Sequence, residues 1–111
     1  MDKLSFYRSC VQDILKKYEN RKPSAGDIEV QLIEDTMRDR YQVCSVGWLE
    51  KRRVHGCKVH IDIKEGKIWI QHNLTEDRLA RELEEKGVPK HDIVLGFHSP
   101  FKRQFTDYAV N

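Results

Sequence analysis

The chain has 111 residues, of which 20 are basic and 18 acidic, and its formal net charge is +2. This length suits one domain with a real core, expected over residues 1–111, and the near-neutral charge argues against an autonomous nucleic-acid binder, which usually has a clear basic excess. No apolar run approaches the roughly 20 residues of a membrane helix, and three scattered cysteines without a signal-like N-terminus indicate the reducing cytoplasm rather than a disulfide framework.

The first half of the chain predicts one helix followed by two strands. Apolar residues recur at helical spacing over residues 3–20, which indicates an amphipathic helix. Residues 20–27 have the composition of a loop. Alternating apolar and polar residues then predict strands over 28–32 and 41–48, with a charged turn at 37–40 between them.

Residues 54–73 predict a β-hairpin. Apolar residues alternate in a third strand over 54–63 and a fourth over 67–72, and Gly66 supplies the positive φ of the turn between them. Because strands joined by short loops pair antiparallel, we expect an α+β fold with a four-stranded antiparallel meander packed on the helices. Pairing about the turn gives three core-side pairs: Ile63–Ile68, Ile61–Ile70 and Val59–His72.

The second half of the chain predicts a helix after the fourth strand, over residues 75–86. Thr75 is its expected N-cap, and Leu74 and Leu79 occupy the positions of a hydrophobic staple. Residues 93–97 are apolar and form either a short edge strand or a buried connector. The tail from Ser99 is irregular, and its aromatic residues indicate that it packs: Phe101, Phe105 and Tyr108.

The other side of the predicted hairpin mixes a large aromatic residue with polar groups. Three pairs are expected there: Asp62–Trp69, His60–Gln71 and Lys58–Asn73. One interpretation is a recognition surface, because an exposed tryptophan on a sheet marks contact sites. The alternative is that a helix or the C-terminal tail covers this side, with His60 and Asp62 merely hydrogen-bonded.

The histidines and cysteines do not predict a metal site or a catalytic centre. Cys57 and His60 are three residues apart, so a regular strand points them to opposite faces, and the hairpin register also separates His60 from His72. No zinc motif is present. A hydrolase would need His60 or His98 beside an acidic residue or Cys57, but no nucleophile elbow or phosphate loop accompanies them. We therefore expect no enzyme activity, metal or cofactor.

Residues 97–105 interleave aromatic and basic side chains, which leaves three interpretations. The first is a tail whose aromatic rings seal the core while Lys102 and Arg103 stay solvated. The second is a protein interface anchored by Phe101 and Arg103. The third is stacking and pairing with single-stranded nucleic acid.

Eight segments carry a family resemblance in combination: 26–30, 39–41, 47–48, 54–63, 67–73, 87–89, 92–98 and 103–106. Together they resemble the XisI-like family of fdxN element excision controlling factors, found mainly in cyanobacteria, over nearly the whole chain. The resemblance implies a small α+β protein linked to programmed excision of a DNA element. It also implies action beside a site-specific recombinase and an XisH-like, nuclease-related companion, and it supplies no catalytic residues.

The residues and the resemblance together lead us to expect a non-enzymatic regulatory protein that binds a nuclease-like partner. Direct DNA binding is one alternative, and a small histidine-using enzyme or ligand-binding domain is another. Homo-oligomerisation through an exposed sheet edge stays open. The expected partner-binding surface consists of His60, Asp62, Trp69, Gln71, Phe101 and Arg103.

Overall fold

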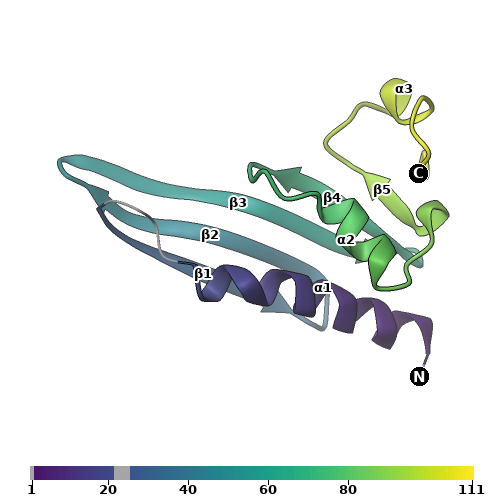
Figure 1. Cartoon of the computed structure of the whole chain (residues 1–111), viewed down its shortest axis with the longest axis horizontal. Helices are drawn as coiled ribbons and strands as arrows, with labels where there is room; N and C mark the ends of the chain where they lie inside the picture. Colours follow the sequence, from purple (N-terminus) through teal and green to yellow (C-terminus); the bar gives the residue numbers. More distant parts are fainter. Residues whose placement is uncertain (1, 22–25) are drawn as a thin grey trace.

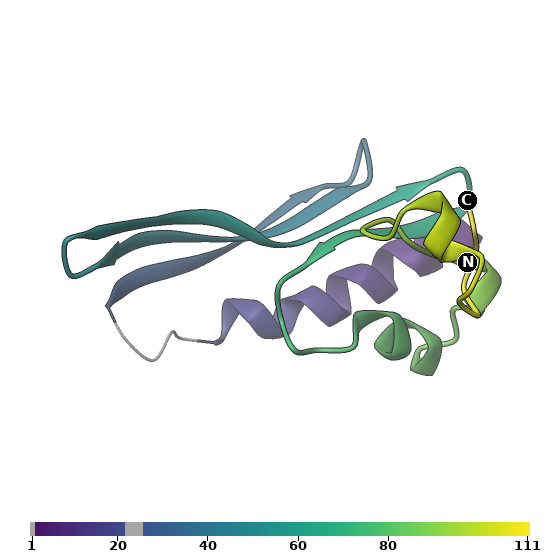
Figure 2. The same cartoon turned by 90° about the horizontal axis from the view of Figure 1, so that it is seen from above.

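A five-stranded sheet with two helices on one of its faces forms the frame of the chain in the computed structural model, which describes residues 2–21 and 26–111 (Figures 1 and 2). The first four strands are antiparallel neighbours in chain order, as the predicted meander requires, and the fifth is parallel to the fourth. The elements are α1 Lys3–Glu19, β1 Asp27–Asp35, β2 Arg40–Leu49, β3 Arg52–Lys64, β4 Lys67–Asn73, α2 Leu79–Glu85, a 3-10 turn at Lys90–Asp92, β5 Ile93–Leu95 and α3 Pro100–Arg103.

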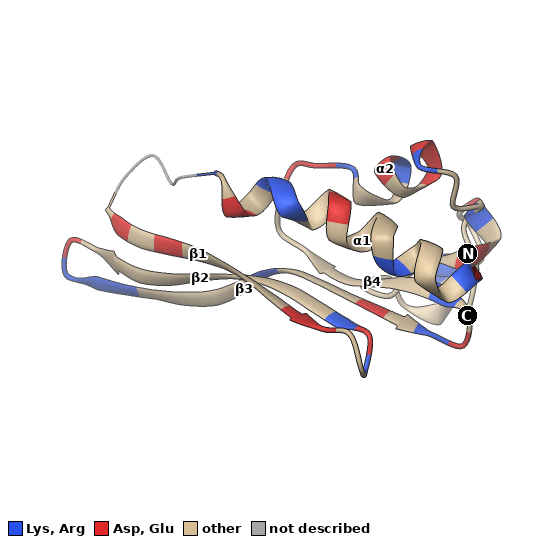
Figure 3. Ribbon diagram, turned by 90° about the horizontal axis from the view of Figure 1, so that it is seen from below, with Lys and Arg blue, Asp and Glu red and all other residues tan. Residues whose placement is uncertain are grey.

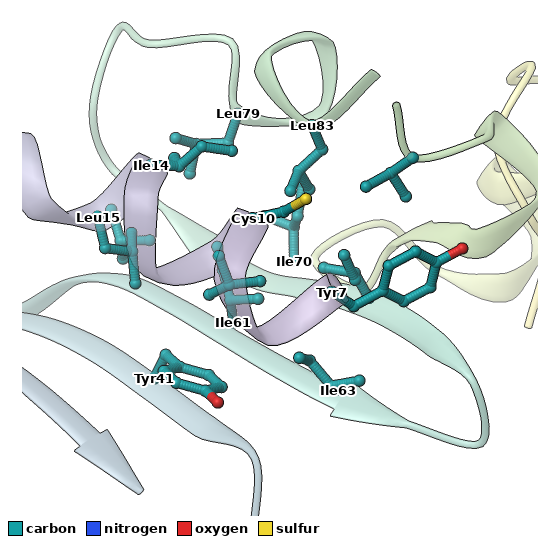
Figure 4. Packing of buried hydrophobic residues seen from close by; sticks show 14 of the residues in the cluster. Tyr7, Cys10, Ile14, Leu15, Tyr41, Ile61, Ile63, Ile70, Leu79 and Leu83 are labelled. Carbon is teal, nitrogen blue, oxygen red and sulfur yellow. The ribbon is translucent and has the colours of Figure 1, made fainter. Parts of the chain in front are cut away.

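Helix α1 supplies one side of the core, which confirms the amphipathic helix predicted near the N-terminus. Asp2 caps it by accepting a hydrogen bond from the Ser5 backbone N–H at 2.7 Å. Its apolar stripe lies between the sheet and α2, where it meets Leu79 and Leu83 (Figure 4). The buried residues of α1 are Tyr7, Cys10, Val11, Ile14, Leu15 and Tyr18. Among the described residues, no helix is long and apolar enough to cross a membrane.

Strands β2 and β3 run well past the end of β4, and their turn projects from the body as a long arm (Figures 1 and 2). The last pair between β3 and β4 is Val59–Asn73. Between this pair and the β2–β3 turn, β3 pairs only with β2, and β2 pairs on its other side with β1. A β-bulge interrupts the β2–β3 ladder at this point, between Val43 and Cys44. Bulges increase local twist, so the arm begins where the sheet changes direction.

The turn of the β3–β4 hairpin has the predicted chemistry. Glu65 has a φ of 53° and Gly66 a φ of 76°, as in a type I′ turn. Next to the turn, the pairs Ile63–Ile68 and Ile61–Ile70 are those predicted from the alternation.

Farther from the turn the predicted register is wrong. A second bulge lies between His60 and Ile61 and leaves Gln71 as the extra residue of β4. His60 therefore pairs with His72, and Val59 pairs with Asn73. This slip replaces the three predicted pairs beyond Ile61–Ile70, namely Val59–His72, His60–Gln71 and Lys58–Asn73.

Helix α2 begins at Leu79, later than predicted, and Thr75 is not its N-cap. The Asn73 side-chain oxygen accepts a hydrogen bond from the Thr75 backbone N–H at 2.9 Å, and the Thr75 hydroxyl accepts one from the Asp77 N–H at 3.2 Å. These local side-chain turns compete with a helical first turn. Leu74 is 63% exposed, so the predicted staple with Leu79 is also absent.

The segment after α2 contains an edge strand, one of the two structures predicted for residues 93–97. Strand β5 pairs in parallel with β4, and Ile93 and Val94 are buried. The tail then forms α3, capped by Ser99, and returns beside β5 through a bridge between Val94 and Ala109. The tail thus packs onto the body as predicted, through Tyr108, but it is helical at Pro100–Arg103 rather than irregular throughout.

Candidate functional site

The candidate site lies on the face of the sheet opposite α1 and α2. Core residues of β3 alternate with His60 and Asp62, and core residues of β4 alternate with Trp69 and Gln71. Alternation therefore points these four side chains away from the helices. All four are half-buried, which identifies a partly covered face rather than bare strand surface.

Asp62 is the centre of a polar network on this face. The His60 Nε2 atom lies 2.8 Å from one carboxylate oxygen, and the Gln71 side-chain amide donates to the other at 3.2 Å. The Asp62 side chain is 14% exposed and that of His60 28%. Because both carboxylate oxygens have partners, the network holds the three side chains in one arrangement.

Gly96, which follows β5, packs directly against the Gln71 side chain of this network. Its backbone N–H donates to the Ile70 carbonyl oxygen at 2.8 Å. A Cβ atom at Gly96 would lie only 2.4 Å from the Gln71 Oε1 atom and 3.2 Å from the Ile70 oxygen. The missing side chain therefore lets the segment after β5 lie directly against Gln71.

Two cations lie close to the Trp69 ring. The Lys64 Nζ atom is 4.1 Å from the ring centroid, and the Arg103 guanidinium carbon is 5.1 Å from it. Lys64 stands two residues after Asp62 on β3, so it is a diagonal neighbour of Trp69 across the hairpin. The sequence prediction did not include Lys64, although its position relative to the Asp62–Trp69 pair was the signal that could have identified it.

Arg103 holds the tail in place. Its guanidinium donates to the backbone oxygens of His98 at 3.0 Å, Val110 at 3.2 Å and Gly96 at 3.5 Å. The interpretation that leaves Arg103 solvated is therefore wrong. Its contacts with three carbonyl groups and with Trp69 make it a support for the tail.

The exposed part of the site is formed by aromatic residues of the tail. Phe101 is 68% exposed and Phe105 is 72% exposed, and their rings meet edge-to-face with centroids 5.2 Å apart. The prediction that these rings seal the core is wrong, and among the tail aromatics Tyr108 packs against the core instead. Phe105 was not among the predicted site residues, although its spacing of four from Phe101 is that of neighbouring side chains on a helix.

Five of the six predicted site residues are linked by direct contacts or strand pairing, and Phe101 is not. His60, Asp62 and Gln71 share hydrogen bonds, and Trp69 pairs with Asp62 across the hairpin and lies beneath Arg103. Phe101 joins this group only through α3, which it shares with Arg103.

The two bulges also correct the faces predicted for the histidines and Cys57. His60 is directly opposite His72, and the bulge at the base of the arm turns Cys57 to the same side as His60. Within residues 2–21 and 26–111, no group of three or more His, Cys, Asp or Glu side chains could hold a metal ion.

A groove of about 630 Å³ lies between α2, the end of β4 and the tail. Its lining includes Leu79, Glu84, Phe97 and Tyr108, but none of the histidines. The Tyr108 hydroxyl donates to Glu84 across it at 2.6 Å. This groove does not join His60, His72 and His98, which is the arrangement that a small histidine-using enzyme would need.

Comparisons with known proteins agree on one family. The model of the XisI protein family matches residues 1–110. The crystal structure of a XisI-like protein from Anabaena variabilis is 49% identical with a TM-score of 0.91, over 97% of this chain and 99% of that chain. The crystal structure of fdxN element excision controlling factor XisI from Anabaena variabilis is 38% identical with a TM-score of 0.88, over 99% of this chain and 100% of that chain. A comparison with curated proteins found no match.

Proposed function

The chain belongs to the XisI family, and on that premise we propose that it is a non-enzymatic accessory factor that controls excision of a DNA element. The solved structure of an fdxN element excision controlling factor supports this role. We propose that the protein acts by binding an XisH-like, nuclease-related partner, and that a site-specific recombinase then carries out the DNA chemistry. A cytoplasmic setting fits the three free cysteines.

The Phe101–Phe105 pair is the observation that carries this proposal. Both rings are more than two-thirds exposed, yet they sit on a segment that Arg103 fixes to the sheet. Exposed aromatic residues on a preorganised segment are typical of binding hot spots, because little conformational entropy is lost when a partner covers them.

The charges beside the pair indicate what the partner surface should look like. Lys102, which directly follows Phe101 in the sequence, is exposed. Lys64 is also exposed and lies beside Trp69. A partner that offers an apolar pocket with an acidic rim would complement this surface.

The test is a binding measurement with the purified companion protein. A double variant, Phe101→Ala with Phe105→Ala, should weaken binding by about 30-fold, because hot-spot residues contribute about 2 kcal/mol or more. Met37→Ala is the matched control, since Met37 is 90% exposed in the turn after β1, away from the tail. Unchanged affinity of a folded double variant would show that this surface is not the contact site.

Trp69→Ala and Arg103→Glu test the support beneath the surface. We expect both to weaken binding through displacement of the tail, so each must be accompanied by a melting curve. A variant that melts like the parent but has lost binding would assign Trp69 or Arg103 to direct contact.

Direct DNA binding is the second candidate function, and the tip of the arm is the observation that favours it. Lys51, Arg52 and Arg53 are exposed there, and Figure 3 shows a continuous blue stretch at the β2–β3 turn, next to an acidic position. Arg53 lies 5.3 Å from the ring of Trp48, which is 49% exposed. Among the described residues, no carboxylate lies within 4.0 Å of these three cations.

A shift assay with the chain alone and duplex DNA at low and moderate salt tests this second function. Phosphate contacts through the tip predict affinity that falls steeply with salt and is lost in the double variant Lys51→Glu with Arg52→Glu. Absence of binding at low salt would exclude it.

A further inference from the structure

Two of the three cysteines face each other at the base of the arm. Cys44 on β2 is the direct partner of Cys57 on β3, next to the bulge between Val43 and Cys44. Strand β4 ends opposite Val59, so β3 has no β4 partner at this pair, while β1 still pairs with β2 there through Gln31 and Cys44.

The register brings the two backbones to disulfide distance. Directly opposed residues of antiparallel strands have Cα atoms about 4.5–5.5 Å apart, and disulfides form at Cα separations of about 4.4–6.8 Å. The side chains also share a face. Val43 and Ser45 are buried on either side of Cys44, which points Cys44 to the open face, and the extra residue of the bulge turns Cys57 the same way.

Both thiols are reduced and partly accessible. Cys44 and Cys57 are half-buried on the face that α1 and α2 leave uncovered. The Cys57 thiol donates to the Val59 carbonyl oxygen at 3.1 Å, and the Cys44 thiol lies 3.7 Å from the Gln42 side-chain oxygen. Burial raises the pKa of the Cys57 thiol, and the neighbouring Cys44 thiol raises it further. Cys10, in contrast, lies on the buried face of α1, in the core.

We propose that Cys44 and Cys57 are a modification site at which a peroxide converts the two thiols to an intramolecular disulfide. This inference is independent of the proposed partner. The Cys44 thiol loses its proton, the thiolate attacks one oxygen of hydrogen peroxide, and the O–O bond breaks to give a Cys44 sulfenic acid and hydroxide, which takes up that proton as water. The Cys57 thiolate then attacks the sulfenic sulfur, the S–S bond forms, and the departing hydroxide takes up a proton as a second water.

The order of the two steps follows from the surroundings of the thiols. The pair loses two electrons and the peroxide gains two, so no further reactant is needed. Burial raises the pKa of the Cys57 thiol, so Cys57 is assigned to the second step, in which the oxidised Cys44 sulfur is already its direct neighbour across the strands. The bond would tie β2 to β3 at the base of the arm and enclose its basic tip, Lys51 to Arg53, in a covalent loop.

The experiment treats the folded full chain with hydrogen peroxide, alkylates remaining thiols after denaturation, and maps the tryptic peptides. We expect loss of two hydrogen atoms in mass, one alkylated cysteine, and residues 41–51 linked to residues 54–58. Cys10 should carry the alkyl group. Reduction with dithiothreitol should restore three alkylated cysteines.

Single variants make the result decisive. Cys44→Ser and Cys57→Ser should each abolish the linked peptide, whereas Cys10→Ser should form it as readily as the parent. The oxidised parent should also melt at a higher temperature than the reduced parent, because the disulfide restricts the unfolded chain. Recovery of three alkylated thiols, or linkage only between two copies of the chain, would overturn the proposal.

Discussion

The Arg103 guanidinium lies over the ring of Trp69, 5.1 Å from its centroid, and the same group donates to three backbone carbonyls of the tail. One side chain thus connects the open face of the sheet to the segment that carries Phe101 and Phe105. Trp69 and Arg103, both predicted to contact a partner, also form the base on which the exposed rings are held.

Replacing Arg103 should therefore release the tail. We expect Arg103→Ala to lower the free energy of unfolding by about 2 kcal/mol, because several carbonyl hydrogen bonds and a cation–π contact are lost together. Urea unfolding followed by tryptophan fluorescence measures this loss. Lys102→Ala is the matched control, since Lys102 is exposed on the same helix, and it should change stability by less than about 0.5 kcal/mol. Equal effects of the two substitutions would contradict the support role.

Gly96→Ala should disturb the Asp62 network more than it disturbs stability. The new methyl group would displace the end of the Gln71 side chain, which costs its hydrogen bond to Asp62, about 1 kcal/mol. The loss of glycine flexibility in the unfolded chain offsets about 0.4–1 kcal/mol of this. The side-chain amide resonances of Gln71 should therefore shift while the unfolding free energy changes little. Gly56→Ala, where a methyl group meets nothing within 4 Å, should leave those resonances in place.

Much of the fold could be predicted because the apolar pattern alone determines it. In the hairpin, Ile61, Ile63, Ile68 and Ile70 must all face the core, so only one register is possible near the turn. Past Ile70 no apolar residue of β4 fixes the register, and the bulge at Gln71 could not be predicted.

Two other predictions, the N-cap at Thr75 and the solvated Arg103, were wrong for different reasons. The first was overridden by a competing local turn, and the second depends on contacts with residues distant in the sequence. Thr75 has the chemistry of an N-cap, but its backbone N–H donates to the Asn73 side chain in a local turn, and the helix begins only at Leu79. The fixed position of Arg103 depends on carbonyl groups at Gly96 and Val110, which only the folded tail brings together.

Stability should fall at acidic pH partly through Asp92. The Asp92 side chain is 7% exposed and accepts a hydrogen bond from the Tyr7 hydroxyl, and Lys3 Nζ lies 2.9 Å from its carboxylate. Burial alone would raise the pKa of Asp92, but the Tyr7 and Lys3 contacts outweigh it and hold the pKa below its usual value of about 4. A depressed folded-state pKa gives stability that is present above the unfolded-state pKa and is lost as pH falls through the folded-state pKa. Urea unfolding between about pH 6 and pH 2 should show this decline.

Tyr7→Phe tests the assignment of this pH dependence. Without the tyrosine hydroxyl, burial opposes the charge of Asp92 with less compensation, so the folded-state pKa of Asp92 should rise toward its unfolded-state value. The acidic decline should then be smaller and should end at a higher pH. An acidic limb that is the same in the variant and the parent would mean that other carboxylates, such as Asp77, dominate. The pKa of Asp77 is also lowered, by hydrogen bonds from Tyr18 and Arg21.

The turn between β3 and β4 offers a stabilising substitution. Glu65 has a φ of 53°, a left-handed conformation that costs a residue with an ordinary side chain about 1–2 kcal/mol. Asparagine tolerates this conformation and, before glycine, is the preferred first residue of a type I′ turn. Glu65→Asn should therefore raise the free energy of unfolding by up to about 1 kcal/mol, measured by urea unfolding. Glu65→Val is the opposite control, because a β-branched side chain is least tolerant of positive φ and should lower stability. If Asn and Val variants were equally stable, the left-handed geometry at Glu65 would not be a source of strain in this hairpin.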